Sequence, residues 1–103
     1  MLYVSGQLPV DQDTGKIIEG DVAAHALMAL NNVESVLIEA KLTRKHVVQC
    51  RVYIPDVAYW DVVNKVYAEF FGEHKPSRVM VPSRELHNGA LVEIEAIAEL
   101  EEV

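Results

Sequence analysis

The sequence has little that could cross-link the chain, anchor it or hold a metal ion. Cys50 is the only cysteine, so no disulfide can form within the chain, and a reducing compartment is expected. No apolar run approaches the ~20 residues that span a bilayer, and no signal-peptide pattern opens the chain. The four histidines are scattered, without a second His or Cys at ligand spacing, so no metal site is expected. We therefore expect a cytoplasmic protein without a membrane partner.

Basic residues are also scarce. Nine Lys and Arg are outnumbered by 16 Asp and Glu, which gives a formal net charge of −7. An acidic surface repels phosphate groups, so binding to nucleic acid is disfavoured. The one tight basic group is Lys41, Arg44, Lys45 and His46, which we interpret as a solvated helix end.

Hydrophobic residues, by contrast, make up 50% of the chain, enough for the core of one domain over residues 1–103. Alternating and helical spacings, with turn signals at Asp11–Gly15 and Asn88–Gly89, divide the chain into six main elements. The predicted elements are strands over Leu2–Val10, Val47–Ile54, Arg78–Val81 and Leu91–Leu100, and helices over about 21–42 and 57–71.

Each predicted helix has a terminal signal and one apolar stripe. Asp21 is a candidate N-cap of the first helix, and Gly72 a candidate C-cap of the second. The stripes are Ala26, Leu30, Val33, Leu37 and Ala40 in the first helix, and Val62, Val63, Val66, Tyr67 and Phe70 in the second.

This order of elements predicts an α+β fold, a two-layer sandwich in which two helices cover one face of a mixed sheet. The last strand turns Val92, Ile94 and Ala96 toward the helices and Glu93 away from them. Its outer face is too polar for a core and too apolar for free surface, so we expect a subunit interface with a polar pocket there.

Two charged residues lie in apolar strands. Arg78 begins the short run Val79–Val81, and Glu93 lies between Val92 and Ile94. Arginine presents a planar fork that suits a carboxylate, and a glutamate can act as a general base. On spacing alone, we favour the structural interpretation, in which Glu93 lies on an exposed sheet face and Arg78 pairs with a surface acid. Cys50 alternates with core residues, and we interpret it as a buried structural thiol.

Longer motifs reduce that ambiguity. They run in order along nearly the whole chain, as SGQLPVD at 5–11, TG at 14–15, NNV at 31–33, VYI at 52–54, VNKVYAEFF at 63–71, PSR at 76–78 and VEIEAIA at 92–98. Together they resemble the RidA/YjgF/UK114 family, also called endoribonuclease L-PSP proteins. The resemblance implies a chorismate-mutase-like fold and a homotrimer with clefts between subunits. The family also has a strand and a tyrosine-bearing loop before the point that matches Met1, and we expect this chain to lack them.

The resemblance also implies an activity, the hydrolysis of 2-iminobutanoate and 2-iminopropanoate to 2-keto acids and ammonia without a cofactor. Arg78 matches the arginine that grips the substrate carboxylate, and Glu93 matches the glutamate that orients water. The implied substrate-binding positions are Ser5, Gly6, Asn64 and Met80, the last where the family often has Cys or Thr. Two alternatives stay open: a non-catalytic trimer that binds small carboxylates, and an endoribonuclease or translation inhibitor.

Overall fold

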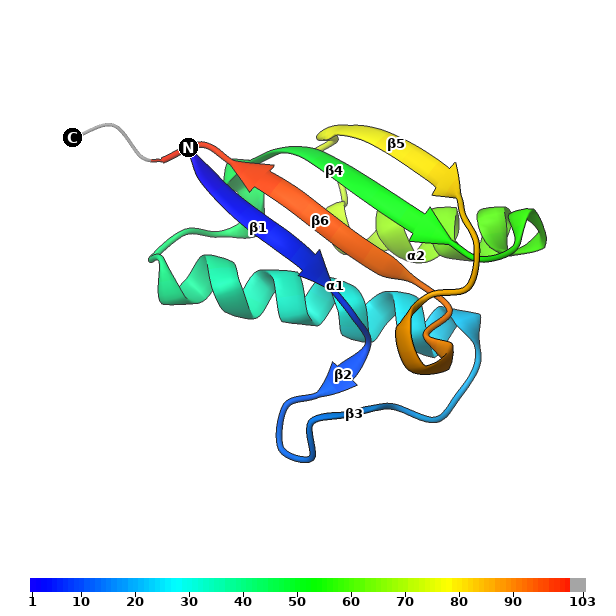
Figure 1. Ribbon diagram of the computed structural model, residues 1–103. Helices are drawn as coiled ribbons and strands as arrows, with labels where there is room; N and C mark the ends of the chain where they lie inside the picture. Colours follow the sequence, from blue (N-terminus) through cyan, green and yellow to red (C-terminus); the bar gives the residue numbers. More distant parts are fainter. Residues whose placement is uncertain (101–103) are drawn as a thin grey trace.

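A computed structural model, which describes residues 1–100, places a four-stranded sheet against two helices (Figure 1). The order in the sheet is β1-β6-β4-β5; β4 and β5 run parallel, and the other neighbours are antiparallel. Both helices lie on the same side of this mixed sheet, which confirms the predicted fold class. The elements are β1 (Leu2–Gln7), β2 (Val10–Asp11), β3 (Lys16–Ile17), α1 (Val22–Glu39), β4 (Val47–Ile54), α2 (Trp60–Phe71), β5 (Ser77–Pro82) and β6 (Glu93–Ala98), with short 3₁₀ turns at Arg44–His46, Val57–Tyr59 and His87–Gly89. Neither α1 nor α2 is long and apolar enough to cross a membrane.

The core lies between the sheet and the helices. In β6, Ile94, Ala96 and Ala98 are buried, while the intervening side chains point to the open face, as the alternation predicts. Strand β4 has the predicted bounds, and Cys50 within it is 1% exposed, which confirms a buried thiol. Burial raises the pKa of Cys50 to about 11.

Helix α1 begins as predicted but ends early. The Asp21 carboxylate accepts a hydrogen bond from the Ala24 N–H at 2.9 Å, the expected N-cap contact. The helix stops at Glu39, short of the predicted end near residue 42, because Lys41 adopts a left-handed conformation with φ 61°. Ala40, predicted on the buried stripe, is therefore exposed.

Helix α2 is shorter than predicted at its start. Residues Val57–Tyr59 form a 3₁₀ turn capped by Asp56, and the α-helix runs from Trp60 to a C-cap at Gly72 with φ 62°. Val62, predicted on the buried side, is 44% exposed. It lies about 100° around the helix from Val63, which points into the core.

The first predicted strand also ends early. Strand β1 stops at Gln7, because the buried Asn32 amide of α1 donates to the carbonyls of Leu8 and Val10, each at 2.9 Å. These bonds pull the chain away from the sheet and toward α1. The small β2–β3 hairpin that follows contains the predicted Asp11–Gly15 turn.

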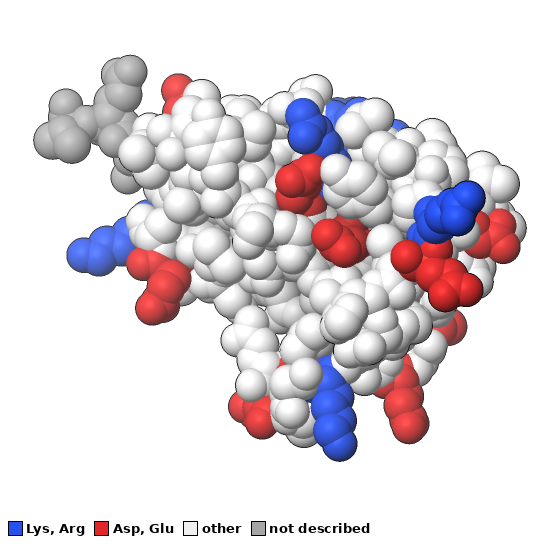
Figure 2. All heavy atoms as spheres, viewed as in Figure 1, with Lys and Arg blue, Asp and Glu red and all other residues white. Residues whose placement is uncertain are grey.

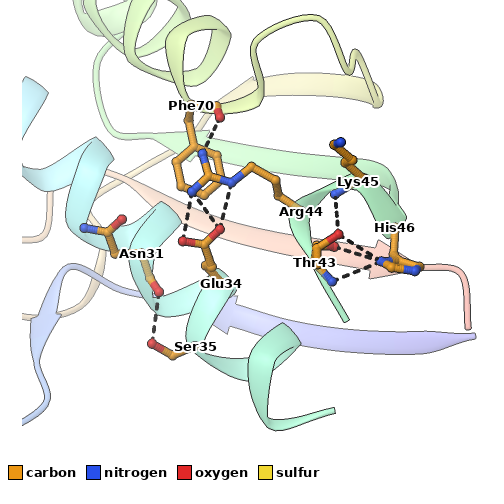
Figure 3. Close-up of polar contacts among 8 residues, drawn as sticks. All are labelled: Asn31, Glu34, Ser35, Thr43, Arg44, Lys45, His46 and Phe70. Carbon is orange, nitrogen blue, oxygen red and sulfur yellow. Dashed lines mark hydrogen bonds and ion pairs between the residues drawn. The ribbon is translucent and has the colours of Figure 1, made fainter. Parts of the chain in front are cut away.

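Arg44 joins the two helices. Its guanidinium donates from Nε to Glu34 Oε2 at 2.7 Å and from Nη2 to Glu34 Oε1 at 2.9 Å, and it lies 3.9 Å from the centre of the Phe70 ring (Figure 3). The interpretation of this basic group as a solvated helix end is therefore wrong for Arg44, because a carboxylate and a ring are both within reach of its long side chain.

His25 is the buried histidine of α1, at 4% exposure. Its Nε2 lies 3.0 Å from the Ile18 carbonyl oxygen, and its Nδ1 accepts from the Leu91 N–H at 3.1 Å. The ring therefore connects the β2–β3 hairpin, α1 and the segment before β6. Near that segment, Asn88 and Gly89 both have positive φ, which confirms the predicted turn.

Candidate functional site

Arg78 lies at the edge of the sheet that α2 covers. The parallel pairing of β4 with β5 sets Arg78 beside Cys50, so its side chain points to the helix face of the sheet. The Nη1 group donates to Asn64 Oδ1 at 2.8 Å, and the guanidinium carbon lies 5.5 Å from the centre of the Tyr67 ring. Among residues 1–100, Arg78 forms no ion pair, so the predicted pairing with a surface acid is not found.

A hollow of about 230 Å³ opens beside this guanidinium. Its walls are mostly apolar, with positive charge from Arg78 and Lys75. The lining residues are Asn64, Tyr67, Ala68, Phe71, Gly72, His74, Lys75, Pro76 and Arg78. A small molecule with one carboxylate and a short apolar tail suits such a lining.

Glu93 belongs to a second group, on the opposite, open face of the sheet. It lies beside Tyr53 of β4 and is half-buried. Strand β1 has a bulge between Val4 and Gln7, where one extra residue is accommodated. Gly6 in this bulge lies directly against the Glu93 carboxylate, because a Cβ at position 6 would overlap Oε2. The bulge and its glycine therefore make the space that Glu93 occupies.

The two acids on this face differ in their partners. Glu95 accepts a hydrogen bond from the Tyr53 hydroxyl at 2.6 Å and lies 3.5 Å from Arg51 Nη1. That hydrogen bond raises the pKa of Tyr53. Glu93, in contrast, has no hydrogen bond or ion pair with any of the described residues. Its oxygens are thus available to a ligand or a water molecule, whereas those of Glu95 are engaged.

Ser5 lies in the same bulge and is exposed on the open face. With Tyr3, Gln49, Arg51, Glu95 and Ile97 it lines a shallow hollow of about 310 Å³. Figure 2 shows this face, with acidic atoms near its middle, basic atoms beside some of them and mostly uncharged surface on the other sides. Tyr3, at 71% exposure, and Val79, at 44%, add exposed apolar area. Such a surface resembles a subunit interface more than a free one.

Met80 differs from the other expected site residues. It pairs with Val52, and its side chain is only 6% exposed within the core. The side chain therefore packs against the core, and a contact from Met80 to a ligand would have to use its backbone.

A single copy of the chain does not bring Arg78 and Glu93 together. Their neighbours on β4 are Cys50 and Tyr53, which are three positions apart and so point to opposite faces. In addition, β5 and β6 lie on opposite sides of β4. The structure thus separates the expected site residues into a pair, Arg78 with Asn64, and a trio, Glu93 with Gly6 and Ser5.

Tyr67 was assigned only to the buried stripe of α2, although its ring faces Arg78. The spacing of Asn64 and Tyr67 could have indicated this, because residues three apart lie on one side of a helix. Asn32 and His25 are buried, and each forms hydrogen bonds with backbone groups of distant segments. No sequence pattern predicted either role.

The comparisons with known proteins agree on one family. A family model described as Endoribonuclease L-PSP matches residues 1–100. A RutC family protein of Pyrococcus horikoshii is 40% identical over 94% of this chain and 77% of its own length. The human 2-iminobutanoate/2-iminopropanoate deaminase is 33% identical over 94% of this chain and 71% of its own.

Solved structures that resemble this chain include members of the same family. Escherichia coli TdcF with bound serine has a TM-score of 0.90 and 35% identity, covering 96% of this chain and 80% of its own. The YjgF gene product of E. coli has a TM-score of 0.87 and 37% identity, covering 93% and 77%.

Proposed function

Because this chain belongs to the endoribonuclease L-PSP family, which includes the RidA/YjgF proteins, we propose that it hydrolyses reactive 2-imino acids to 2-keto acids and ammonia. The observation that carries the proposal is the Arg78 guanidinium and the Glu93 carboxylate, neither of which has a charged partner among residues 1–100. Arg78 lies beside a small hollow, and Glu93 lies against Gly6 in the β1 bulge. The substrates we propose are 2-iminobutanoate and 2-iminopropanoate.

The proposed reaction needs one anchor and one proton carrier. The Arg78 guanidinium holds the substrate carboxylate through two parallel hydrogen bonds. Glu93 takes a proton from water as the water oxygen attacks the imine carbon, and the C=N electron pair moves to nitrogen. Glu93 then returns that proton to the nitrogen, which gives a carbinolamine with one hydroxyl and one amino group. The same carboxylate next moves the hydroxyl proton to the amino nitrogen; the C–N bond breaks, its electron pair leaves with ammonia, and the carbonyl forms. The products are one keto acid and one ammonia for each imino acid and water consumed, and no cofactor takes part.

We further propose that two copies of the chain complete each site. Arg78 and Glu93 point to opposite faces of one sheet, so a shared cavity needs Glu93 of one copy and Arg78 of another. The half-apolar open face, with Tyr3 and Val79 exposed, is the surface on which copies would associate. The homotrimer that the family resemblance implies is one closed arrangement that meets this need. A reducing, cytoplasmic setting would keep the single thiol Cys50 unmodified.

The test is keto-acid release from 2-iminobutanoate, generated in place by a dehydratase acting on threonine and measured above the spontaneous rate. Arg78→Ala should lower kcat/KM by about tenfold to a hundredfold, because a charge-assisted contact is lost. Glu93→Gln should lower kcat by about a hundredfold or more, as loss of a general base does. Arg84→Ala is the matched control, because Arg84 is an exposed arginine that lines neither of the two hollows.

An Arg78→Ala variant as active as the wild type would contradict the proposal. Binding of a keto acid that depends on Arg78 but occurs without any turnover would favour a carboxylate-binding protein instead. We do not propose ribonuclease activity, despite the family's name, because a net charge of −7 disfavours RNA.

A further inference from the structure

We propose that Tyr67 is a positioning residue for Arg78, and that Asn64 acts on Arg78 rather than on the substrate. This inference rests on the proposed role of Arg78 as the carboxylate anchor. Asn64 and Tyr67 stand three residues apart on α2 and meet the guanidinium, one through a 2.8 Å hydrogen bond and the other through its ring at 5.5 Å. Helix α2 thus holds the anchor on two sides before any ligand binds.

The Tyr67 ring is a fixed surface. The residue is 7% exposed, and its ring packs against the Phe71 ring with centres 4.8 Å apart. The hydroxyl is buried and has no hydrogen-bond partner of good geometry among the described residues, although the Cys50 thiol lies beside it. Burial raises the pKa of Tyr67, so the ring stays neutral, and its face attracts the guanidinium. A flexible arginine that packs against such a ring has already lost part of its conformational freedom before a ligand binds, so binding costs less entropy.

The Asn64 contact leaves the rest of the fork open. Arginine has five N–H donors, and Asn64 Oδ1 receives one of them, from Nη1. No other hydrogen bond from Arg78 to the described residues is found, so the edge formed by Nε and Nη2 can receive both oxygens of a carboxylate. Because Asn64 is neutral, it orients Arg78 without cancelling its charge. An aspartate at position 64 would instead form an ion pair and compete with the substrate.

The chain contains a matched control for the ring contact. Phe70, on the same helix, lies under Arg44 with a separation of 3.9 Å, and it is 8% exposed. Replacing Phe70 with leucine removes an aromatic ring of similar burial and a contact of the same kind. Arg44 bonds to Glu34, outside the candidate site. Any general weakening of α2 should therefore appear in both leucine variants, whereas a loss of positioning should appear only at Tyr67.

The experiment compares Tyr67→Leu, Tyr67→Phe and Phe70→Leu in the full chain. Tyr67→Leu should raise KM for 2-iminobutanoate by about two- to fivefold at nearly constant kcat, as loss of a cation–π contact implies. Tyr67→Phe keeps the ring and should restore the wild-type KM, and Phe70→Leu should leave KM unchanged. A purely structural role would instead lower kcat through loss of folded protein. Asn64→Asp should raise KM more than Asn64→Ala does.

A second measurement does not depend on turnover. In ¹⁵N-labelled protein, the Arg78 Nε–H resonance, assigned by its absence in Arg78→Ala, should move and broaden in Tyr67→Leu but not in Phe70→Leu. An unchanged resonance in Tyr67→Leu would overturn the inference, as would an unchanged KM. If the wild type fails to hydrolyse the imine, the proposed function falls, while the resonance still decides whether Tyr67 positions Arg78.

Discussion

Subunit mixing offers the sharpest test of a site that two chains complete. Arg78→Ala and Glu93→Ala each remove one half of the proposed site and leave the other half intact. In a ring of copies, a working site would take Arg78 from one subunit and Glu93 from its neighbour. If the two variants assemble at random in equal amounts, about a quarter of the sites receive both native residues. Each variant alone should retain at most about a tenth of the wild-type rate, and the mixture should recover about a quarter of it.

The assay is keto-acid release after the two variants are unfolded together and refolded, so that subunits exchange. Variants mixed after separate refolding serve as the control without exchange. A second mixture, of wild type with the Arg78→Ala/Glu93→Ala double variant, separates the two geometries further. It should keep about a quarter of the rate if sites span two chains, and about half if each chain has its own site. A co-refolded pair of single variants without activity would refute the two-chain site, provided that refolded wild type is active.

Three further predictions concern the surroundings of the site. Gly6→Ala should abolish most turnover while the chain stays folded, because the new Cβ displaces the flexible Glu93 carboxylate; activity and circular dichroism measure the two effects. Asn32→Ala should lower the free energy of unfolding by about 2–3 kcal/mol, because two hydrogen bonds from a buried amide are lost, as urea denaturation would show. Burial of Cys50 favours the protonated thiol in the folded state, so this thiol stabilises the fold fully below about pH 9. The stabilisation is lost as the pH rises to about 11, and this pH-dependent loss should be absent in Cys50→Val.

Each of these has a contrary outcome. Wild-type turnover in Gly6→Ala would mean that the Glu93 carboxylate does not need its present position. An unfolding free energy unchanged in Asn32→Ala would mean that water replaces both lost bonds. Equal slopes of stability against pH above pH 9 in wild type and Cys50→Val would assign the loss to other groups, of which Tyr67 is the first to examine.

Local chemistry explains which parts of the fold were predictable. The bounds of β4, the alternation of β6, the Asp21 cap and the Gly72 end depend on neighbours within a few residues, and all four were predicted correctly. The early end of β1 depends on Asn32, more than 20 residues away, and no pattern near Gln7 signals it. The error at Arg44 has the same origin, because Glu34 and Phe70 come from two different helices.

The candidate site divides in a similar way. Arg78 and Glu93 were singled out because each is a charged residue inside an apolar strand, and neither has an ion pair within the described part of the chain. The face of Glu93 was predicted correctly from the alternation of β6. The face of Arg78 was not predicted, because it depends on how β5 pairs with β4. A shift of one position in that register would reverse the face. The trimer and the catalytic roles stay predictions.

The separation of Arg78 and Glu93 across the sheet also affects how harmful substitutions should be interpreted. A folded monomer would possess every catalytic group and still be inert, so turnover would vary with protein concentration. Substitutions at Tyr3, Gln49 or Ile97 would then abolish turnover by weakening self-association, although none of these residues would contact the substrate. Inactivating variants would spread over a broad contact area instead of clustering around one cavity.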